Sequence, residues 1–371
     1  MGLLKRRKLP EMNIYEQCSA GKKSFTLYND NAIRPCCVWR GTGGYSNDIN
    51  SSLKEFTNYT DEQVEQFCAK CIFQENANYE SQRNCIDNDL KDALYHYDLS
   101  FSNLCNLTCR MCSSINSSKW VPLEAYLKEK TGVDWEEARD YAERNKLVKF
   151  SQSRLNDIID HINKNSKTNT VSIEIKGGEP LIQDELKIFF DNLKYLENIK
   201  IRCFSNLTKL PDWFLEKADT VKHFNLRVSI EGVNNTYEYI RADSSFDEFV
   251  KNLDQLKYTN IHWDFAPMQF MYNIGDLHAL DALILSYNKP IIDHMLFGPT
   301  HLNVKVLPPA ARKILLRHVP NHYKILRAVI TDGPIIHKWK KFCNYTKLLD
   351  EYHSSNFLET PTGKLLQPWI Y

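Results

Sequence analysis

The sequence predicts an α/β fold built on a parallel sheet, with a small cysteine-rich α+β domain ahead of it. Helical stretches alternate with six short apolar runs, a pattern typical of βα units. The 371 residues, of which 43% are hydrophobic, are enough for one large domain and a satellite. Strands are expected at residues 95–100, 171–175, 200–204, 225–230, 262–266 and 291–297.

Three cysteines within eight residues, Cys105, Cys109 and Cys112, form the most informative motif. Their thiolates can converge on one metal centre from a short loop and leave one metal position without a protein ligand. A structural zinc site normally has four protein ligands, whereas an open position lets a substrate or cofactor bind. Soft sulfur ligands suit iron–sulfur clusters or zinc. On spacing alone, core thiols and half of a zinc knuckle stay open as alternatives.

A second motif follows 65 residues later, where one of the expected strands ends. Gly177 and Gly178 allow the backbone to approach a ligand, and Glu179 can accept hydrogen bonds from a cationic group. Pro180 suits the first position of the helix expected over 181–196. Alone, the pattern is typical of an ordinary strand-to-helix turn. Its place after the cysteine loop indicates a binding site.

Together, the two motifs resemble those of the radical S-adenosylmethionine (SAM) superfamily. The resemblance implies a [4Fe-4S] cluster on Cys105, Cys109 and Cys112, with SAM on the open iron and its methionyl amino group against the Gly-Gly-Glu segment. It further implies that one electron cleaves SAM to methionine and a 5′-deoxyadenosyl radical, which abstracts a hydrogen atom from a substrate. Met111 departs from the pattern, because an aromatic residue often precedes the third cysteine in the family.

Weaker matches follow in the family's order. Ser229 and Glu231 resemble its ribose-contacting Ser-x-Asp-Gly segment, with Glu where Asp is commoner. Arg241 resembles the arginine that reaches the SAM carboxylate, and Asn206 follows a strand that ends in polar residues. The resemblance therefore implies further SAM contacts from Asn206, Ser229 and Arg241. Two later segments, 264–269 and 273–277, resemble the fifth strand and the stretch near the adenine.

The family's fold is a partial (β/α)6 TIM-like barrel, which agrees with the six expected strands. Chemistry in such barrels takes place at the carboxyl ends of the strands, where each motif falls. We expect the cysteine-rich domain at 1–92, the barrel at 93–300 with a helical insertion at about 113–170, and a helical extension at 301–371.

Helices are expected within the insertion and the extension, and the chain is expected to end in an extended tail. The tail is marked by Pro361 and Pro368, and it is expected to cover the exposed edge of the barrel, with substrate binding as the alternative. The helices are expected near Trp120, at 135–139 and 155–162, and at 307–317 and 339–350.

The N-terminal segment carries six of the eleven cysteines. A hairpin is expected over 25–34, with its turn at 29–31, and a helix around 60–67 leads into a Cys-x-x-Cys pair. This order resembles the twitch or SPASM modules of radical SAM proteins, placed here before the barrel, and implies an auxiliary [4Fe-4S] cluster. Zinc or unliganded thiols stay open on spacing alone.

The sequence ranks the ligands of the auxiliary cluster but does not identify the fourth one. Cys68 and Cys71 come first, and Cys36 comes next. Cys37 and Cys85 compete for the fourth position, unless that iron is open to substrate. Cys18 ranks below them, and Cys203 and Cys343 are expected to be structural thiols.

Composition restricts the location and the partners. The formal charge of +1 at pH 7 gives no overall field that would attract nucleic acid. No apolar run reaches membrane-spanning length, and the start lacks the apolar core of a signal peptide. Eleven cysteines without a leader fit metal ligation in a reducing compartment, so a cytoplasmic location is expected.

The predicted function is that of a radical SAM enzyme with two iron–sulfur clusters, SAM, and a reductant such as flavodoxin or ferredoxin. The resemblance to twitch-type proteins, which often act on peptides, favours a peptide or protein substrate. A small metabolite, sugar or nucleoside stays open. So do a non-catalytic zinc-binding protein and a scaffold that binds SAM without cleaving it. No motif places a catalytic acid or base.

Overall fold

The computed structural model describes residues 18–28, 33–37, 39, 49, 60, 62, 66–76, 81–132, 147–331 and 338–370. Within them, the chain forms a seven-stranded sheet in the order β2-β1-β3-β4-β5-β6-β7. β1 and β2 are antiparallel, and every other neighbouring pair is parallel, which confirms the α/β class. The strands are β1 Ser24–Leu27, β2 Ile33–Arg34, β3 Tyr95–Leu99, β4 Val171–Ile175, β5 Ile199–Ser205, β6 His223–Ile230 and β7 Trp263–Pro267.

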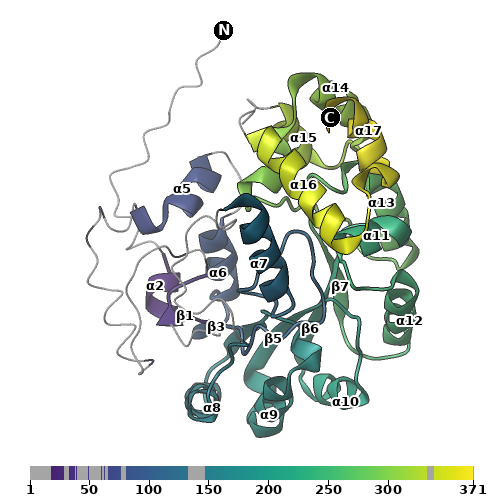
Figure 1. Ribbon diagram of the computed structural model, residues 1–371. Helices are drawn as coiled ribbons and strands as arrows, with labels where there is room; N and C mark the ends of the chain where they lie inside the picture. The colour runs from purple at the N-terminus through teal and green to yellow at the C-terminus, as the bar shows by residue number, and fades with distance from the viewer. Residues whose placement is uncertain are drawn as a thin grey trace.

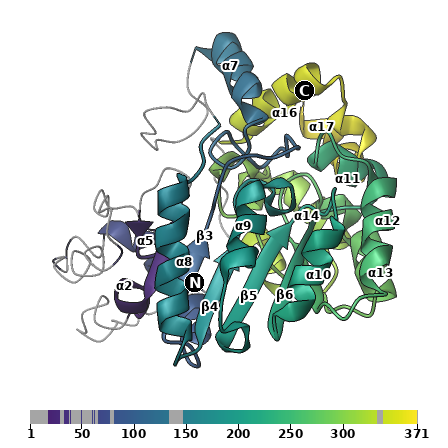
Figure 2. The same ribbon diagram turned by 90° about the horizontal axis from the view of Figure 1, so that it is seen from below.

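Helices cover the outer face of the parallel strands. Figures 1 and 2 show α8, α9, α10 and α12 in succession along that face. In α12, Phe249, Leu253 and Leu256 are buried at helical spacing, so one side of the helix packs on the sheet. The helices are α2 Ala20–Lys23, α5 Ala69–Asn76, α6 Gln82–Asp89, α7 Trp120–Thr131, α8 Gln152–Ser166, α9 Asp184–Asn192, α10 Asp212–Thr220, α11 Asn234–Ile240, α12 Phe246–Leu256, α13 Leu277–Ser286, α14 Pro309–His318, α15 Lys324–Thr331, α16 Trp339–His353 and α17 Pro361–Ile370.

Strand β5 shows how the sequence separates the two faces of the sheet. Ile201 and Cys203 are buried in the apolar core, whereas Arg202 and Phe204 alternate with them and are half-buried. Successive side chains of a strand point to opposite faces. The half-buried face is the one that carries polar and ligand-facing groups, as the site below shows.

The N-terminal hairpin belongs to this sheet. β1 lies parallel to β3, with Phe25 opposite Tyr97, and antiparallel to β2, with Thr26 opposite Arg34. The two strands of the predicted hairpin are therefore confirmed, and its turn at 29–31 lies outside the described residues. Figure 1 shows α2, α5 and α6 beside this edge of the sheet. The boundary at residue 92 stays a prediction.

The strand predicted over 291–297 is wrong. Met295 makes a single parallel bridge with Gln269, beyond the last residue of β7. That last residue, Pro267, has no N–H with which to continue the ladder. The Asp293 carboxylate accepts the backbone N–H of Ile325 at 2.6 Å, which fixes the segment as an irregular connection.

Two helix predictions also need correction. The helix expected over 181–196 is divided into a 3₁₀ turn, Pro180–Ile182, and α9, because Gln183 is extended. The expected extended tail is α17. Pro361 fits the first position of that helix, and a side chain at Gly363 would collide with the carbonyl oxygen of Phe357. Glycine thus lets α17 pack closely.

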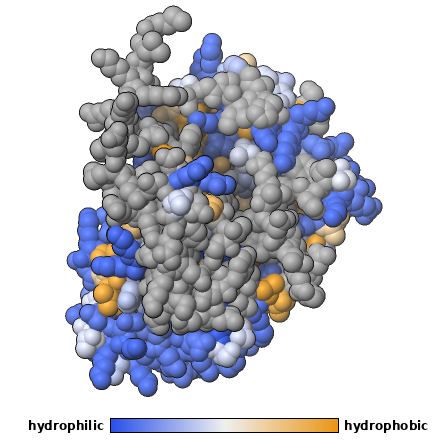
Figure 3. Space-filling view, turned by 90° about the vertical axis from the view of Figure 1, so that its left-hand side faces the viewer, coloured by the Kyte–Doolittle hydropathy of each residue, from blue (hydrophilic) through white to orange (hydrophobic). Residues whose placement is uncertain are grey.

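The insertion contains α7 and α8, which agree with the helices expected near Trp120 and over 155–162, whereas 135–139 lies outside the described residues. In the part of the chain that the structure describes, no helix combines the length and apolar character needed to cross a membrane. Figure 3 shows a face whose described surface is mostly hydrophilic, with small separate hydrophobic spots, as is usual for surface facing water.

Candidate functional site

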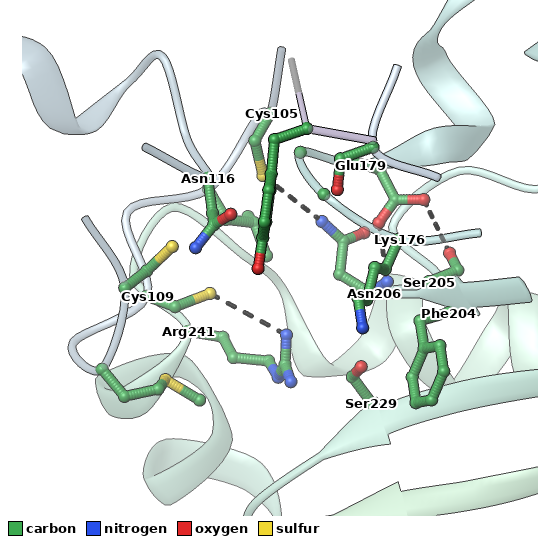
Figure 4. Close-up of a pocket in the computed structure, with 17 residues that line it drawn as sticks. Cys105, Cys109, Asn116, Lys176, Glu179, Phe204, Ser205, Asn206, Ser229 and Arg241 are labelled. Atoms are coloured by element: carbon green, nitrogen blue, oxygen red, sulfur yellow. Dashed lines mark hydrogen bonds between the residues drawn. The ribbon is translucent and has the colours of Figure 1, made fainter. Parts of the chain in front are cut away.

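A cavity of about 440 Å³ lies at the carboxyl ends of the strands. Residues from the ends of β1, β3, β4, β5 and β6 and from the cysteine loop contribute to its wall (Figure 4). Its size is in the usual range for small-molecule sites. The structure brings together here every site residue that the sequence predicted for the barrel: Cys105, Cys109, Cys112, Gly177, Gly178, Glu179, Asn206, Ser229 and Arg241.

The cysteine loop is held by its backbone. The N–H groups of Thr108 and Arg110 donate to the carbonyl oxygens of Ala242 and Ile240 at 3.1 and 2.9 Å. The Trp120 indole N–H donates to the Cys109 carbonyl at 3.0 Å. These contacts join the loop to the segment that carries Arg241 and to α7. The protein itself therefore fixes the backbone that carries the three cysteines.

Burial favours the protonated form of two of these thiols, Cys105 and Cys109. It raises the pKa of Cys109 to about 12, although the neighbouring Arg241 guanidinium opposes the shift, and it also raises the pKa of Cys105. Thiolates are the ligand form, so a bound metal centre must displace these protons. Three soft donors on one cavity wall match the chemistry of an iron–sulfur cluster.

Arg110, between two of the cysteines, ties the loop to the C-terminal helices. Its side chain is 1% exposed, and its Nη2 lies 2.9 Å from the Asp350 carboxylate on α16. Its Nε donates to the Tyr239 carbonyl at 2.7 Å, and its guanidinium stacks 3.7 Å from the centre of the Tyr239 ring. Tyr345 on α16 donates its hydroxyl to the Arg110 carbonyl at 2.9 Å. Sequence reasoning missed this residue.

Gly177 and Gly178 are required by conformation and by packing. Their φ angles are +82° and +57°, in the left-handed region. An added Cβ would lie 2.2 Å from the Ser100 hydroxyl at Gly177 and 2.3 Å from the Leu104 carbonyl oxygen at Gly178. The glycines therefore let the end of β4 pack against the end of β3 and the cysteine loop.

Glu179 is buried and has one acceptor position to spare. Its Oε1 accepts from the Leu181 N–H at 3.1 Å and the Ser205 hydroxyl at 2.7 Å, and its Oε2 accepts from the Asn206 N–H at 2.7 Å. A carboxylate has about four lone-pair positions. Burial raises the pKa of Glu179, and these three donors oppose that shift. The remaining position on Oε2 suits a cationic donor in the cavity.

Arg241 forms a buried ion pair that the family pattern does not predict. Its Nε and Nη2 donate to the two oxygens of Glu231 at 2.6 and 2.8 Å, and its Nη1 lies 3.8 Å from the Cys109 sulfur. Glu231 therefore holds the guanidinium side-on and leaves Nη1 toward the cavity. Asn206 has its side-chain nitrogen 4.0 Å from the Cys105 sulfur, and Ser229 lines the same cavity.

Lys176 lines the cavity, and sequence reasoning did not single it out. Its ammonium lies 2.8 Å from Asp98 and 2.9 Å from Glu174, and Glu174 also accepts from Arg202 at 3.0 Å. Burial alone would raise the pKa of Glu174, but the surrounding cations lower it to about 2. In the sequence, this group of charged side chains can be recognised by charged residues at alternate positions of otherwise apolar strands.

A second, smaller cavity lies among α2, α5 and α6 and is lined by Cys18, Cys36, Cys68 and Cys71. Cys37 and Cys85, the two expected competitors for the fourth position, are not among its lining residues. Cys37 is half-buried near Lys176, and loss of solvent around its thiol raises its pKa to about 11. Among the described residues, no group of three or more potential ligands is arranged around a single metal ion in either cavity.

Residues 99–284 match the family model described as the Radical SAM superfamily. The match covers half of the chain, so the chain belongs to this superfamily. Membership defines a radical SAM enzyme, a class that uses a [4Fe-4S] cluster and SAM, which confirms the predicted family and enzyme class.

The chain is also similar to several solved structures. Native anSMEcpe with bound AdoMet has 14% identity, a TM-score of 0.37, and coverage of 54% of this chain and 50% of that one. Streptococcus suis SuiB bound to precursor peptide SuiA has 13% identity, a TM-score of 0.37, and coverage of 67% and 45%. The chain thus spans about half the length of each. No curated protein matches the sequence.

Proposed function

We propose that Cys105, Cys109 and Cys112 hold a [4Fe-4S] cluster and that SAM fills the cavity beside them. The observation that carries the proposal is the convergence of these three thiols with the spare acceptor of Glu179 and with Nη1 of Arg241, which lies beside the Cys109 sulfur. When bound, the cluster and SAM supply one-electron reductive cleavage to methionine and a 5′-deoxyadenosyl radical, which abstracts hydrogen from a substrate.

The protein's own groups orient SAM and exclude water. The open position on Glu179 accepts the methionyl ammonium, and Nη1 of Arg241 donates to the methionyl carboxylate, because these are the groups of matching charge. Ser229 and Asn206 offer further polar contacts in the cavity. Leu107 and Met111 form an apolar part of the cavity lining, next to the three cysteines, and limit the access of water to the cluster.

We further propose that the second cavity holds an auxiliary [4Fe-4S] cluster on Cys18, Cys36, Cys68 and Cys71. Four thiols line one space, and this set replaces Cys37 and Cys85 of the sequence-based ranking by Cys18. The resemblance of the segment to twitch modules supports a peptide or protein substrate and a reductant such as flavodoxin or ferredoxin.

The test is iron, sulfide and SAM cleavage on protein that has been reconstituted without oxygen. We expect about eight irons per chain, as two [4Fe-4S] clusters require, and 5′-deoxyadenosine on reduction. Cys105→Ala/Cys109→Ala/Cys112→Ala should keep about four irons and lose cleavage. Stoichiometric zinc without iron would overturn both cluster assignments. Iron without cleavage would identify a scaffold that binds SAM but does not cleave it.

A further inference from the structure

The second cavity contains a buried hydrogen-bond donor that no described residue satisfies. Arg83 lines it together with the four cysteines, and its side chain is 16% exposed. Its Nε donates to Oε1 of Glu75 at 3.0 Å, and its Nη2 pairs with Oε2 of the same carboxylate. Its Nη1 is buried, and it has no hydrogen-bond partner among the residues that the structure describes. A buried polar group left unpaired costs about 1–3 kcal/mol, so its presence calls for an explanation.

The orientation of this guanidinium is fixed by its neighbours. Glu75 lies on α5, the helix that carries Cys71, and Arg83 lies on α6. Ser81 caps α6 through the Asn84 N–H at 3.2 Å and also donates its hydroxyl to Glu75. Since both oxygens of Glu75 are engaged on one side of the guanidinium fork, Nη1 points away from the carboxylate.

Sulfur is the acceptor chemistry that the cavity offers to this donor. Among the described residues, the rest of the lining is formed by the thiols of Cys18, Cys36, Cys68 and Cys71 and by apolar groups such as Phe67, Ile72 and Ile86. Arg83 lines the same cavity as these thiols, and a positive charge close to sulfur favours negative charge on it.

We propose that Arg83 donates an Nη1–H···S hydrogen bond to the iron–sulfur group of this cavity and sets its reduction potential. The inference rests on the proposed auxiliary cluster and goes beyond it. Negative charge on the sulfurs increases when such a group is reduced, so a fixed N–H donor stabilises the reduced form more than the oxidised form. Glu75 lies on the side of the guanidinium away from the sulfurs and makes the Arg83–Glu75 pair neutral overall. The positively charged Nη1 end of Arg83 faces the sulfurs. Arg83 is thus a positioning residue that raises the potential.

The experiment is a potentiometric titration of the full-length protein, monitored by electron paramagnetic resonance. It uses the Cys105→Ala/Cys109→Ala/Cys112→Ala background, in which the auxiliary cluster is the iron centre that remains. Arg83→Met should keep about four irons and shift the midpoint potential to a more negative value. Arg83→Lys, which keeps the charge but loses the fork, should shift it less. Lys91→Met, an exposed lysine just after α6, removes one positive charge from the same segment and should leave the potential unchanged.

The possible results distinguish a failure of the role of Arg83 from a failure of the proposed auxiliary cluster. If the background protein holds about four irons and Arg83→Met titrates at the parental potential, the assignment of Arg83 is wrong and the cluster stands. A potential that moves equally in Lys91→Met would also overturn it, because the effect would then be one of general charge. If the background protein holds no iron, the auxiliary cluster fails, and the role of Arg83 fails with it. If Arg83→Met loses its iron, the potential is measured on Arg83→Lys instead. A midpoint potential of Arg83→Lys equal to that of the background protein would contradict the hydrogen bond.

Discussion

At the residue scale, Glu179 has two tasks that one substitution can separate. Its carboxylate accepts from Ser205 and Asn206 at the end of β5 and from Leu181 within the turn, and under the proposed function it keeps one acceptor position for SAM. Glu179→Gln should weaken SAM binding by tenfold or more, since a hydrogen bond to a charged group is worth about 1.5–3 kcal/mol. Equilibrium binding of SAM to the reconstituted protein measures the effect.

Ser205→Ala is the matched control for that substitution. It removes one of the three donors to Glu179 and should lower stability by about 1 kcal/mol, with SAM affinity retained. Equal losses of SAM affinity in both variants would mean that Glu179 serves only to fasten the turn.

The Arg241–Glu231 pair predicts a pH-dependent stability. Both side chains are buried, at 7% and 2% exposure, so Arg241→Gln leaves an uncompensated carboxyl. Breaking a buried pair in this way costs about 3–5 kcal/mol. Burial already raises the pKa of Glu231, and Arg241 opposes that shift, so the variant raises this pKa further.

Linkage between proton binding and folding sets the direction of this pH dependence. A carboxyl whose pKa is higher in the folded than in the unfolded state loses stability as pH rises above the unfolded value. The penalty of Arg241→Gln should therefore be larger at pH 7 than at pH 5, as measured by denaturant unfolding. Glu231→Gln/Arg241→Gln should recover part of the loss at pH 7. A penalty that does not change with pH would contradict an ionised Glu231.

At the scale of elements, α16 and the cysteine loop are predicted to act together. Asp350 accepts from Arg110 and also from the Phe357 N–H at 2.8 Å, so it joins the loop to the C-terminal segment. Asp350→Asn should leave Arg110 without its counter-charge and loosen the loop. We expect iron to leave the SAM-binding cluster several-fold faster when a chelator is added.

The neighbouring Glu351 provides the comparison. It lies on the exposed side of α16, where its carboxylate accepts from the Tyr126 hydroxyl at 3.1 Å. Glu351→Gln should release iron at the wild-type rate. If Asp350→Asn also releases iron at that rate, the tie between α16 and the loop has no effect on how the cluster is held.

The sequence could predict the barrel part of the site because its geometry follows from local patterns. Glu179, Asn206 and Ser229 each end or follow a strand, and parallel neighbouring strands carry such residues to one edge of the sheet. Arg110 could not be found in this way. Its partner Asp350 is 240 residues away, and no local pattern encodes a contact of that separation.

At the scale of the whole molecule, the two ends of the chain were the hardest to predict. The pairing of β1 with β3 and the packing of α17 are long-range contacts, and alternation or prolines report only local preferences. Cys18 belongs to no motif. It reaches the second cavity because the Ser19 N–H donates to Asp87 on α6 at 3.3 Å and Ala20 packs against Ile86.

This difference between sequence and structure gives a prediction for the whole protein. If packing of α2 on α6 selects the fourth ligand, Cys18→Ala should lower the iron content from about eight to about four per chain. SAM-binding iron should remain, because Cys105, Cys109 and Cys112 lie in the other cavity. Iron analysis of the reconstituted variant is the measurement.

Cys37→Ala and Cys85→Ala are the informative comparisons, since neither residue lines the second cavity. Both should retain about eight irons. The reverse result, with full iron in Cys18→Ala and loss in either of the others, would restore the order that spacing alone favours. It would also mean that the hairpin or α6 turns a different thiol inward when the cluster binds. The packing around Ala20 and Ile86 argues against such a turn, because it already holds Cys18 and Cys36 against one apolar cluster.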